Sequence, residues 1–252
     1  MDESHAMEVF FDIQRGLPRQ GPGSDDETRR ALSYCRELPA RPSVLDVGCG
    51  PGMQTLVLAE TLNAHVSAVD LHQEYLDELR IRAAKTGLSD RIKPQLADMS
   101  DLSYPPASFD LIWAEGSAYI MGVGNALRTW KRLLKPQGYI GLTELVWLID
   151  DPPQEVKRFF DAEYSVMGNV DANLSIATDA GYRLLAHFTL PDSAWWDDYY
   201  TPLRRKLPGL RDKYCNDEAA LGLVTMTETE IAMREKYRTA FGYEFIVMQV
   251  SA

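Results

Sequence analysis

The stretch V-L-D-V-G-C-G-P-G, residues 44–52, decides the fold of this chain of 252 residues. Residues 44–47 are typical of a short apolar strand and residues 53–62 of a helix, so the three glycines fall in a strand-to-helix turn. Glycine allows such a turn to bend tightly and to approach a ligand without Cβ clashes. The spacing departs from the dinucleotide pattern G-x-G-x-x-G, because Met53 stands where the third glycine would fall.

Strands and helices alternate on either side of this loop. Further strands are expected at residues 65–70, 91–96, 109–113, 139–146, 182–190 and 243–250, and helices at 24–38, 53–62, 72–86, 124–134 and 152–167. This alternation predicts a doubly wound α/β sheet of seven strands, mostly parallel, with helices on both faces. The last strand is expected to be antiparallel, and Pro94 favours an edge position for its strand.

The chain divides into four predicted parts. Residues 1–40 form an N-terminal cap and helix, 41–190 the ligand-binding α/β core, 191–241 a helical, aromatic-rich insertion that acts as a substrate lid, and 242–252 the final strand. Inserted segments of this kind often carry specificity, because they vary while the core persists.

Charge and composition exclude several classes of function. The formal net charge is −11, with 26 basic against 37 acidic residues, which disfavours nucleic acid as a partner. The three cysteines and four histidines are scattered without ligand spacing, so no metal site is expected. No apolar run approaches the length of a membrane span, and the acidic N-terminus lacks a signal-peptide pattern. We expect a cytoplasmic protein that is a monomer or a homodimer.

Three carboxylates follow three successive strands. Asp46 precedes the glycines, Asp70 ends the strand at 65–70, and Asp98 follows the strand at 91–96. Carboxylates at these strand ends disfavour a polyphosphate and suit a cationic or neutral ligand, with Asp70 placed to accept from ribose hydroxyls. S-adenosylmethionine fits this charge, since it carries a sulfonium and an ammonium group and no phosphate.

The sequence resembles the class I S-adenosylmethionine-dependent methyltransferases over residues 40–146. The matching pieces are V-L-D-V-G-C-G-P-G, A-V-D at 68–70, L-A-D-M at 96–99, F-D-L-I-W-A-E-G at 109–116 and L-L-K-P-Q-G-Y at 133–139. R-Q-G-P-G-S at 19–24 and W-A-E-G-S-A-Y at 113–119 resemble a narrower bacterial and archaeal branch, related to the quinone-biosynthesis-type methyltransferases. The resemblance implies a Rossmann-like methyltransferase fold with S-adenosylmethionine as cofactor and S-adenosylhomocysteine as product.

The resemblance also implies roles for individual residues. The methionine part of the cofactor would be held by Asp46, Gly48, Cys49, Gly50 and Gly52, the ribose by Asp70 and Leu71, and the adenine by Asp98 and Met99. Ala114 and Glu115 would lie beside the sulfonium, and Gln20 and Gly21 would fold over the cofactor.

The sequence indicates fewer residues for the binding of the methyl acceptor than for the binding of the cofactor. Glu115 is the candidate general base, needed only if the acceptor must lose a proton. Candidate substrate residues follow the strand ends or lie in the insertion: Tyr119, Glu144, Trp147, Trp196 and Tyr200. Because Trp195 and Trp196 are adjacent, both cannot face one side of a helix, and at least one is expected to pack inward.

Three functions remain open on this evidence. The leading one is methyl transfer to a small molecule. A non-catalytic S-adenosylmethionine-binding protein would carry the same cofactor motifs. A nicotinamide-dependent oxidoreductase is disfavoured by Met53 and Asp98.

Overall fold

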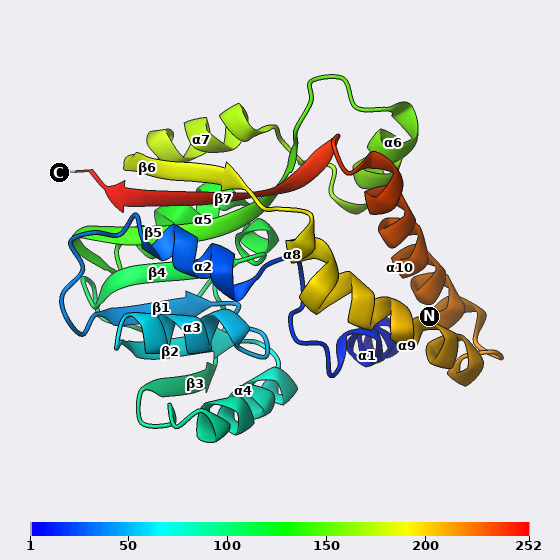
Figure 1. Ribbon diagram of the computed structural model, residues 1–252, viewed down its shortest axis with the longest axis horizontal. Helices are drawn as coiled ribbons and strands as arrows, with labels where there is room; N and C mark the ends of the chain where they lie inside the picture. The colour runs from blue at the N-terminus through cyan, green and yellow to red at the C-terminus, as the bar shows by residue number, and fades with distance from the viewer. Residues whose placement is uncertain (1, 252) are drawn as a thin grey trace.

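The computed structural model describes residues 2–251, so residue 1 of the predicted cap and residue 252 of the predicted final strand lie outside the described residues. Its centre is a seven-stranded sheet of order β3-β2-β1-β4-β5-β7-β6 (Figure 1). The strands are β1 (Ser43–Val47), β2 (His65–Asp70), β3 (Ile92–Leu96), β4 (Phe109–Glu115), β5 (Leu134–Trp147), β6 (Tyr182–Thr189) and β7 (Phe241–Val250).

The pairing confirms the predicted fold. Strands β1 to β5 run parallel, and β7 is antiparallel to both β5 and β6. β3 pairs with β2 and forms one edge of the sheet, so Pro94 lies where a missing backbone donor costs least. The strand order reverses at β1 and β4, and in open α/β sheets ligands bind at the carboxyl ends of strands at such a reversal.

Helices cover both faces of the sheet. The helices and helical turns are α1 (Glu3–Gln14), α2 (Asp25–Leu32), α3 (Met53–Thr61), α4 (Gln73–Lys85), η1 (Ala118–Met121), α5 (Val123–Lys131), α6 (Gln154–Glu163), α7 (Val170–Asp179), α8 (Ser193–Trp195), η2 (Trp196–Tyr200), α9 (Thr201–Lys213) and α10 (Glu218–Tyr237). One buried cluster packs α2, α3 and α4 on the sheet, and a second packs α5 and α7 on the opposite face. None of the helices within residues 2–251 has the length and apolar character needed to cross a membrane.

The segment between β6 and β7 forms a helical layer at the carboxyl ends of the parallel strands. It contains α8, the π-helical turn η2, α9 and α10, and α1 and α6 pack against it in a third buried cluster (Figure 1). The Lys206 ammonium on α9 donates to the carbonyls of Asp12 and Ile13 at 3.0 and 2.8 Å, near the end of α1 where helix carbonyls lack partners. The N-terminal helix is thereby fixed to the insertion, and Trp195 packs inward as expected.

Several predicted boundaries were wrong by a few residues. Helix α2 begins as predicted, with the Ser24 hydroxyl accepting from the Glu27 amide at 3.2 Å, but it ends at Leu32 rather than near residue 38. Helix α5 ends at Lys131 and β5 begins at Leu134, because the backbone of Leu133 accepts from Phe109 at 3.0 Å and joins the sheet. Strand β4 extends to Glu115, two residues beyond its predicted end.

Candidate active site

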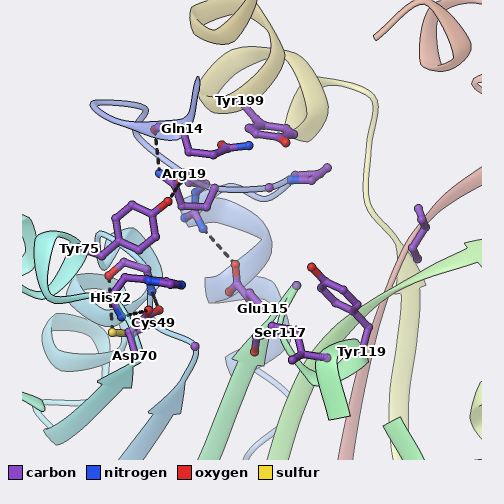
Figure 2. Close-up of a pocket in the computed structure, with 18 of the residues that line it drawn as sticks. Gln14, Arg19, Cys49, Asp70, His72, Tyr75, Glu115, Ser117, Tyr119 and Tyr199 are labelled. Atoms are coloured by element: carbon purple, nitrogen blue, oxygen red, sulfur yellow. Dashed lines mark hydrogen bonds and ion pairs between the residues drawn. The ribbon is translucent and has the colours of Figure 1, made fainter. Parts of the chain in front are cut away.

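A cavity of about 820 Å³ opens at the carboxyl ends of β1, β2 and β4. The carboxyl ends of these strands form its floor. Its walls come from the N-terminal segment 10–22, the turn η1, helix α6 and the insertion. The cavity joins two regions of different chemistry, one beside the glycine loop and one beneath the insertion (Figure 2).

The glycine loop lines the first region. Gly48 and Gly50 have φ values of +68° and +51°, in the left-handed region that favours glycine. A Cβ on Gly48 would lie 2.4 Å from the Cβ of Ser117, so a larger residue would push β4 away from the loop. The Gly48 and Cys49 amides both donate to the Val69 carbonyl, at 2.9 and 3.0 Å, which binds the loop to the end of β2.

Two of the predicted carboxylates face the same region. Asp70 accepts from the Gly50 amide through Oδ2 and from the His72 amide through Oδ1, both at 2.9 Å. Asp98 accepts from the Ser100 side chain and amide, each at 2.7 Å, and these hydrogen bonds lower the pKa of Asp98. The loop, both carboxylates and the neighbours Leu71 and Met99 therefore line one region.

The N-terminal segment covers this region from above. Gln20 and Gly21 line the cavity, and the Gln20 amide oxygen accepts from the Tyr75 hydroxyl at 2.9 Å. The Gln20 Cγ lies 3.4 Å from the position of a Cβ on Gly50, so the segment sits directly over the loop. Figure 2 shows the neighbouring Arg19 side chain pointing down to Glu115.

Glu115 is held on both carboxylate oxygens. Its Oε2 accepts from Arg19 at 3.0 Å, and its Oε1 accepts from the Thr28 hydroxyl at 2.6 Å and the Trp113 indole at 2.8 Å. Both side chains of the ion pair are nearly enclosed, with 4% of Arg19 and 6% of Glu115 exposed. Arg19 also binds Asp25 at 2.8 Å. Glu115 lines the cavity, but each of its two carboxylate oxygens already accepts at least one hydrogen bond from the protein.

The second region is aromatic and was only partly anticipated. Tyr119, a candidate substrate residue, lines it, with its ring 5.7 Å from the ring of Tyr164. The remaining aromatic walls include Tyr199, Tyr243 and Trp195, and two carboxylates, Glu163 and Glu230, also line it. Sequence reasoning did not single out Arg19, Tyr164, Tyr243, Glu163 or Glu230. Of these residues, only Arg19 could have been suspected from the sequence, because it precedes Gln20, which was expected to fold over the cofactor.

Three predicted cofactor residues do not reach the cavity. Asp46 is fully buried and accepts from the Thr55 hydroxyl at 2.5 Å, and burial raises its pKa to about 7. A Cβ on Gly52 would lie 2.2 Å from Leu79, so Gly52 permits the packing of α3 on α4. Ala114 is fully buried in the cluster beneath α5. Asp46, Gly52 and Ala114 therefore pack beneath the residues that line the cavity and do not line it themselves.

The predicted substrate residues are also divided. Glu144 is buried away from the cavity, where it accepts from the Tyr164 hydroxyl at 2.8 Å, and burial raises its pKa to about 7. Tyr200 is buried and donates to Glu230 at 2.7 Å. Trp147 packs on Phe160.

Trp196 lines a separate small depression rather than the main cavity, and the Arg204 guanidinium lies 5.1 Å from its ring centre. Glu144 and Tyr200 therefore reach the cavity only through Tyr164 and Glu230, while Trp147 and Trp196 do not line it.

Residues 44–138 match a family model described as a methyltransferase domain. The chain is 32% identical to a sterol 24-C-methyltransferase of Gibberella zeae over 174 residues, which are 64% of this chain and 44% of that protein. The chain spans less than half the length of three curated relatives that it matches, at 44%, 40% and 42%.

Solved structures share the whole architecture at low identity. A methyltransferase from Geobacter sulfurreducens, dependent on S-adenosylmethionine and solved with S-adenosylhomocysteine, is 20% identical, with a TM-score of 0.81 over 96% of this chain and 97% of that one. The [4+2]-cyclase SpnF is 21% identical, with a TM-score of 0.77 over 98% and 93%. Residues 44–138 thus resemble a methyltransferase domain, and the chain shares the fold of the S-adenosylmethionine-dependent methyltransferase from Geobacter sulfurreducens.

Proposed function

We propose that this protein binds S-adenosylmethionine and transfers its methyl group to a small-molecule acceptor. The observation that carries the proposal is the single cavity in which the glycine loop, Asp70 and Asp98 line one region and aromatic side chains line the other. The match of residues 44–138 to a methyltransferase domain supports it.

The residues of the first region suit the cofactor. The carboxylate of Asp70 is already oriented by two backbone amides, so it can accept from ribose hydroxyls without further ordering. Asp98 and Met99 offer an acceptor and an apolar surface for adenine. A Cβ on Gly50 would point at Gln20, so the glycine leaves the space between loop and covering segment free for the methionine part.

The protein's part in the reaction is to bind, orient and exclude water. When bound, the cofactor supplies a methyl group already activated by the sulfonium, and the acceptor's lone pair displaces it in line. Because its oxygens are engaged by Arg19, Thr28 and Trp113, we propose that Glu115 positions the covering segment rather than removing a proton.

Membership of the quinone-biosynthesis-type branch remains part of this proposal. It is supported by the motifs at 19–24 and 113–119, whose residues Arg19, Gln20 and Glu115 meet over the cavity. A fungal sterol methyltransferase among the relatives does not single out that branch.

Calorimetry tests the cofactor assignment directly. We expect micromolar binding of S-adenosylmethionine and S-adenosylhomocysteine and none of a nicotinamide dinucleotide. Transfer of a labelled methyl group to members of a metabolite panel then separates an enzyme from a binding protein. Tight dinucleotide binding without binding of S-adenosylmethionine would refute the proposal.

A further inference from the structure

The charges that line the cavity are strongly unbalanced. Five carboxylates line it: Asp70, Asp98, Glu115, Glu163 and Glu230. Among the described lining residues Arg19 is the one lysine or arginine, and its guanidinium is already shared by Glu115 and Asp25. An anionic acceptor would therefore meet uncompensated negative charge, whereas a cation would be attracted.

Two of these carboxylates belong to the aromatic region. Glu163 ends α6 and is exposed, and Glu230 lies on α10, partly buried. Within residues 2–251 neither takes part in a salt bridge, although their helices carry others, such as Lys236–Glu155 and Arg211–Glu228. Glu230 has one hydrogen bond, from the Tyr200 hydroxyl at 2.7 Å to Oε1. Both carboxylates thus retain acceptor capacity towards the cavity.

The environment of Glu230 disfavours its negative charge in the absence of a cation. Burial raises the pKa of Glu230 against the opposing effect of the hydrogen bond from Tyr200, and the charge of Glu163 adds a smaller rise. A positive group between the two carboxylates would offset both effects.

Aromatic rings complete this region. Tyr119, Tyr164, Tyr199 and Tyr243 line it from four different elements or loops, with Trp195 5.4 Å from the ring of Tyr243. Figure 2 shows Tyr199 above Glu115 and Tyr119 to its right. Aromatic faces attract cations where water is excluded, and they also bury apolar surface.

We infer that the methyl acceptor is an amine on an apolar or aromatic skeleton, whose cationic nitrogen is bound by Glu230 and Glu163 within the ring of tyrosines. The bound ammonium gives one proton to Glu230, and the lone pair of the neutral amine then takes the methyl group as S-adenosylhomocysteine leaves. Acceptors that carry phosphate or carboxylate groups are excluded by the same charges. This inference rests on the proposed function and narrows its substrate class.

The test uses the protein saturated with S-adenosylhomocysteine. Calorimetry measures the binding of three matched series: arylalkyl and alkyl amines, the corresponding carboxylates, and the corresponding alcohols, with phenyl, indolyl, naphthyl and dodecyl skeletons. We expect at least one amine to bind at least tenfold more tightly than its carboxylate and alcohol partners, because a charged hydrogen bond and cation–π contacts are added.

Two substitutions assign that preference to this region. Glu230→Gln keeps an oxygen to accept from Tyr200 but removes the charge, and it should weaken amine binding about tenfold while leaving alcohol and S-adenosylhomocysteine binding unchanged. Glu228→Gln, the matched control on the same helix, removes a carboxylate that pairs with Arg211 and does not line the cavity. It should leave all three series unchanged.

The outcomes separate this inference from the proposed function. Binding of S-adenosylhomocysteine without any amine preference, or a preference that survives Glu230→Gln, overturns the inference alone. Absence of S-adenosylhomocysteine binding overturns the proposed function and, with it, this assignment of the acceptor.

Discussion

Asp70 has two tasks in the proposed site, and both depend on its carboxylate. It holds the glycine loop through the Gly50 amide and lines the cavity where we propose that the ribose binds. Asp70→Ala should therefore weaken S-adenosylmethionine binding by about 1–3 kcal/mol, the cost of losing a charge-assisted hydrogen bond. Calorimetry checks this, with the exposed Asp90→Ala as control. An unchanged dissociation constant would exclude Asp70 from the cofactor site.

Substitution of Glu115 distinguishes a positioning role of its carboxylate from a role in proton transfer. Glu115→Gln removes the ion pair with Arg19 that fixes the covering segment. If Glu115 positions groups, turnover should fall about tenfold, partly through KM, and cofactor affinity should also fall. A general base would show a loss of two to four orders of magnitude in kcat with cofactor affinity retained.

Thr28→Val provides the matched variant for Glu115, because it removes one hydrogen bond to the same carboxylate and leaves its charge. If Glu115 has a positioning role, Thr28→Val should also lower turnover and cofactor affinity, but by less than Glu115→Gln does. A large kcat loss in Glu115→Gln with none in Thr28→Val would contradict the positioning role.

The segment between α1 and α2 is held by a few specific contacts rather than by a regular element. Gln20 accepts a hydrogen bond from Tyr75, and Arg19 donates one to Glu115. The Gly23 amide donates to the carbonyl of Ala194 in the insertion at 3.0 Å. Local opening is governed by the number and strength of such contacts, and a cofactor beneath Gln20 would add to them.

Hydrogen exchange should report this closure. We expect amides in residues 10–24 to exchange more slowly when S-adenosylhomocysteine is bound, while the loop 103–108, remote from the cavity lining, stays unchanged. Equal exchange with and without S-adenosylhomocysteine would show that the segment does not cover the cofactor.

The whole molecule carries two buried carboxylates that make its stability depend on pH. Burial raises the pKa of Glu144 to about 7, above its ordinary value of 4.5, and acts on Asp46 in the same way. The folded state therefore keeps a proton on Glu144 that the unfolded chain releases, and this stabilisation is lost as the pH rises from about 4.5 through 7.

The free energy of unfolding of the wild type, minus that of Glu144→Gln, should fall by about 1–3 kcal/mol between pH 5 and 8. Urea denaturation across this range measures the difference, with the exposed Glu60→Gln as control. A difference that is constant with pH, or that rises, would contradict a raised pKa for Glu144.

Local pattern was enough to predict the architecture and much of the cofactor region. The strand, glycine turn and helix around residues 44–62 depend on neighbouring residues, and the carboxyl ends of parallel strands share one edge of the sheet. Asp70, Leu71, Asp98 and Met99 could thus be expected together. Boundaries such as the start of β5 were misjudged, because Leu134 joins the sheet only through its pairing with Phe109.

The sequence by itself determined the α/β class, the glycine loop and the strand-end carboxylates, because each depends on residues within a few positions or on the strand period. Only the tertiary structure decided the partners of Glu115 and the composition of the second region. Arg19 and Glu115 are separated by 96 residues, and Tyr200 and Glu230 by 30. Such contacts arise from how the insertion packs on α1 and the sheet, and no local pattern encodes that packing.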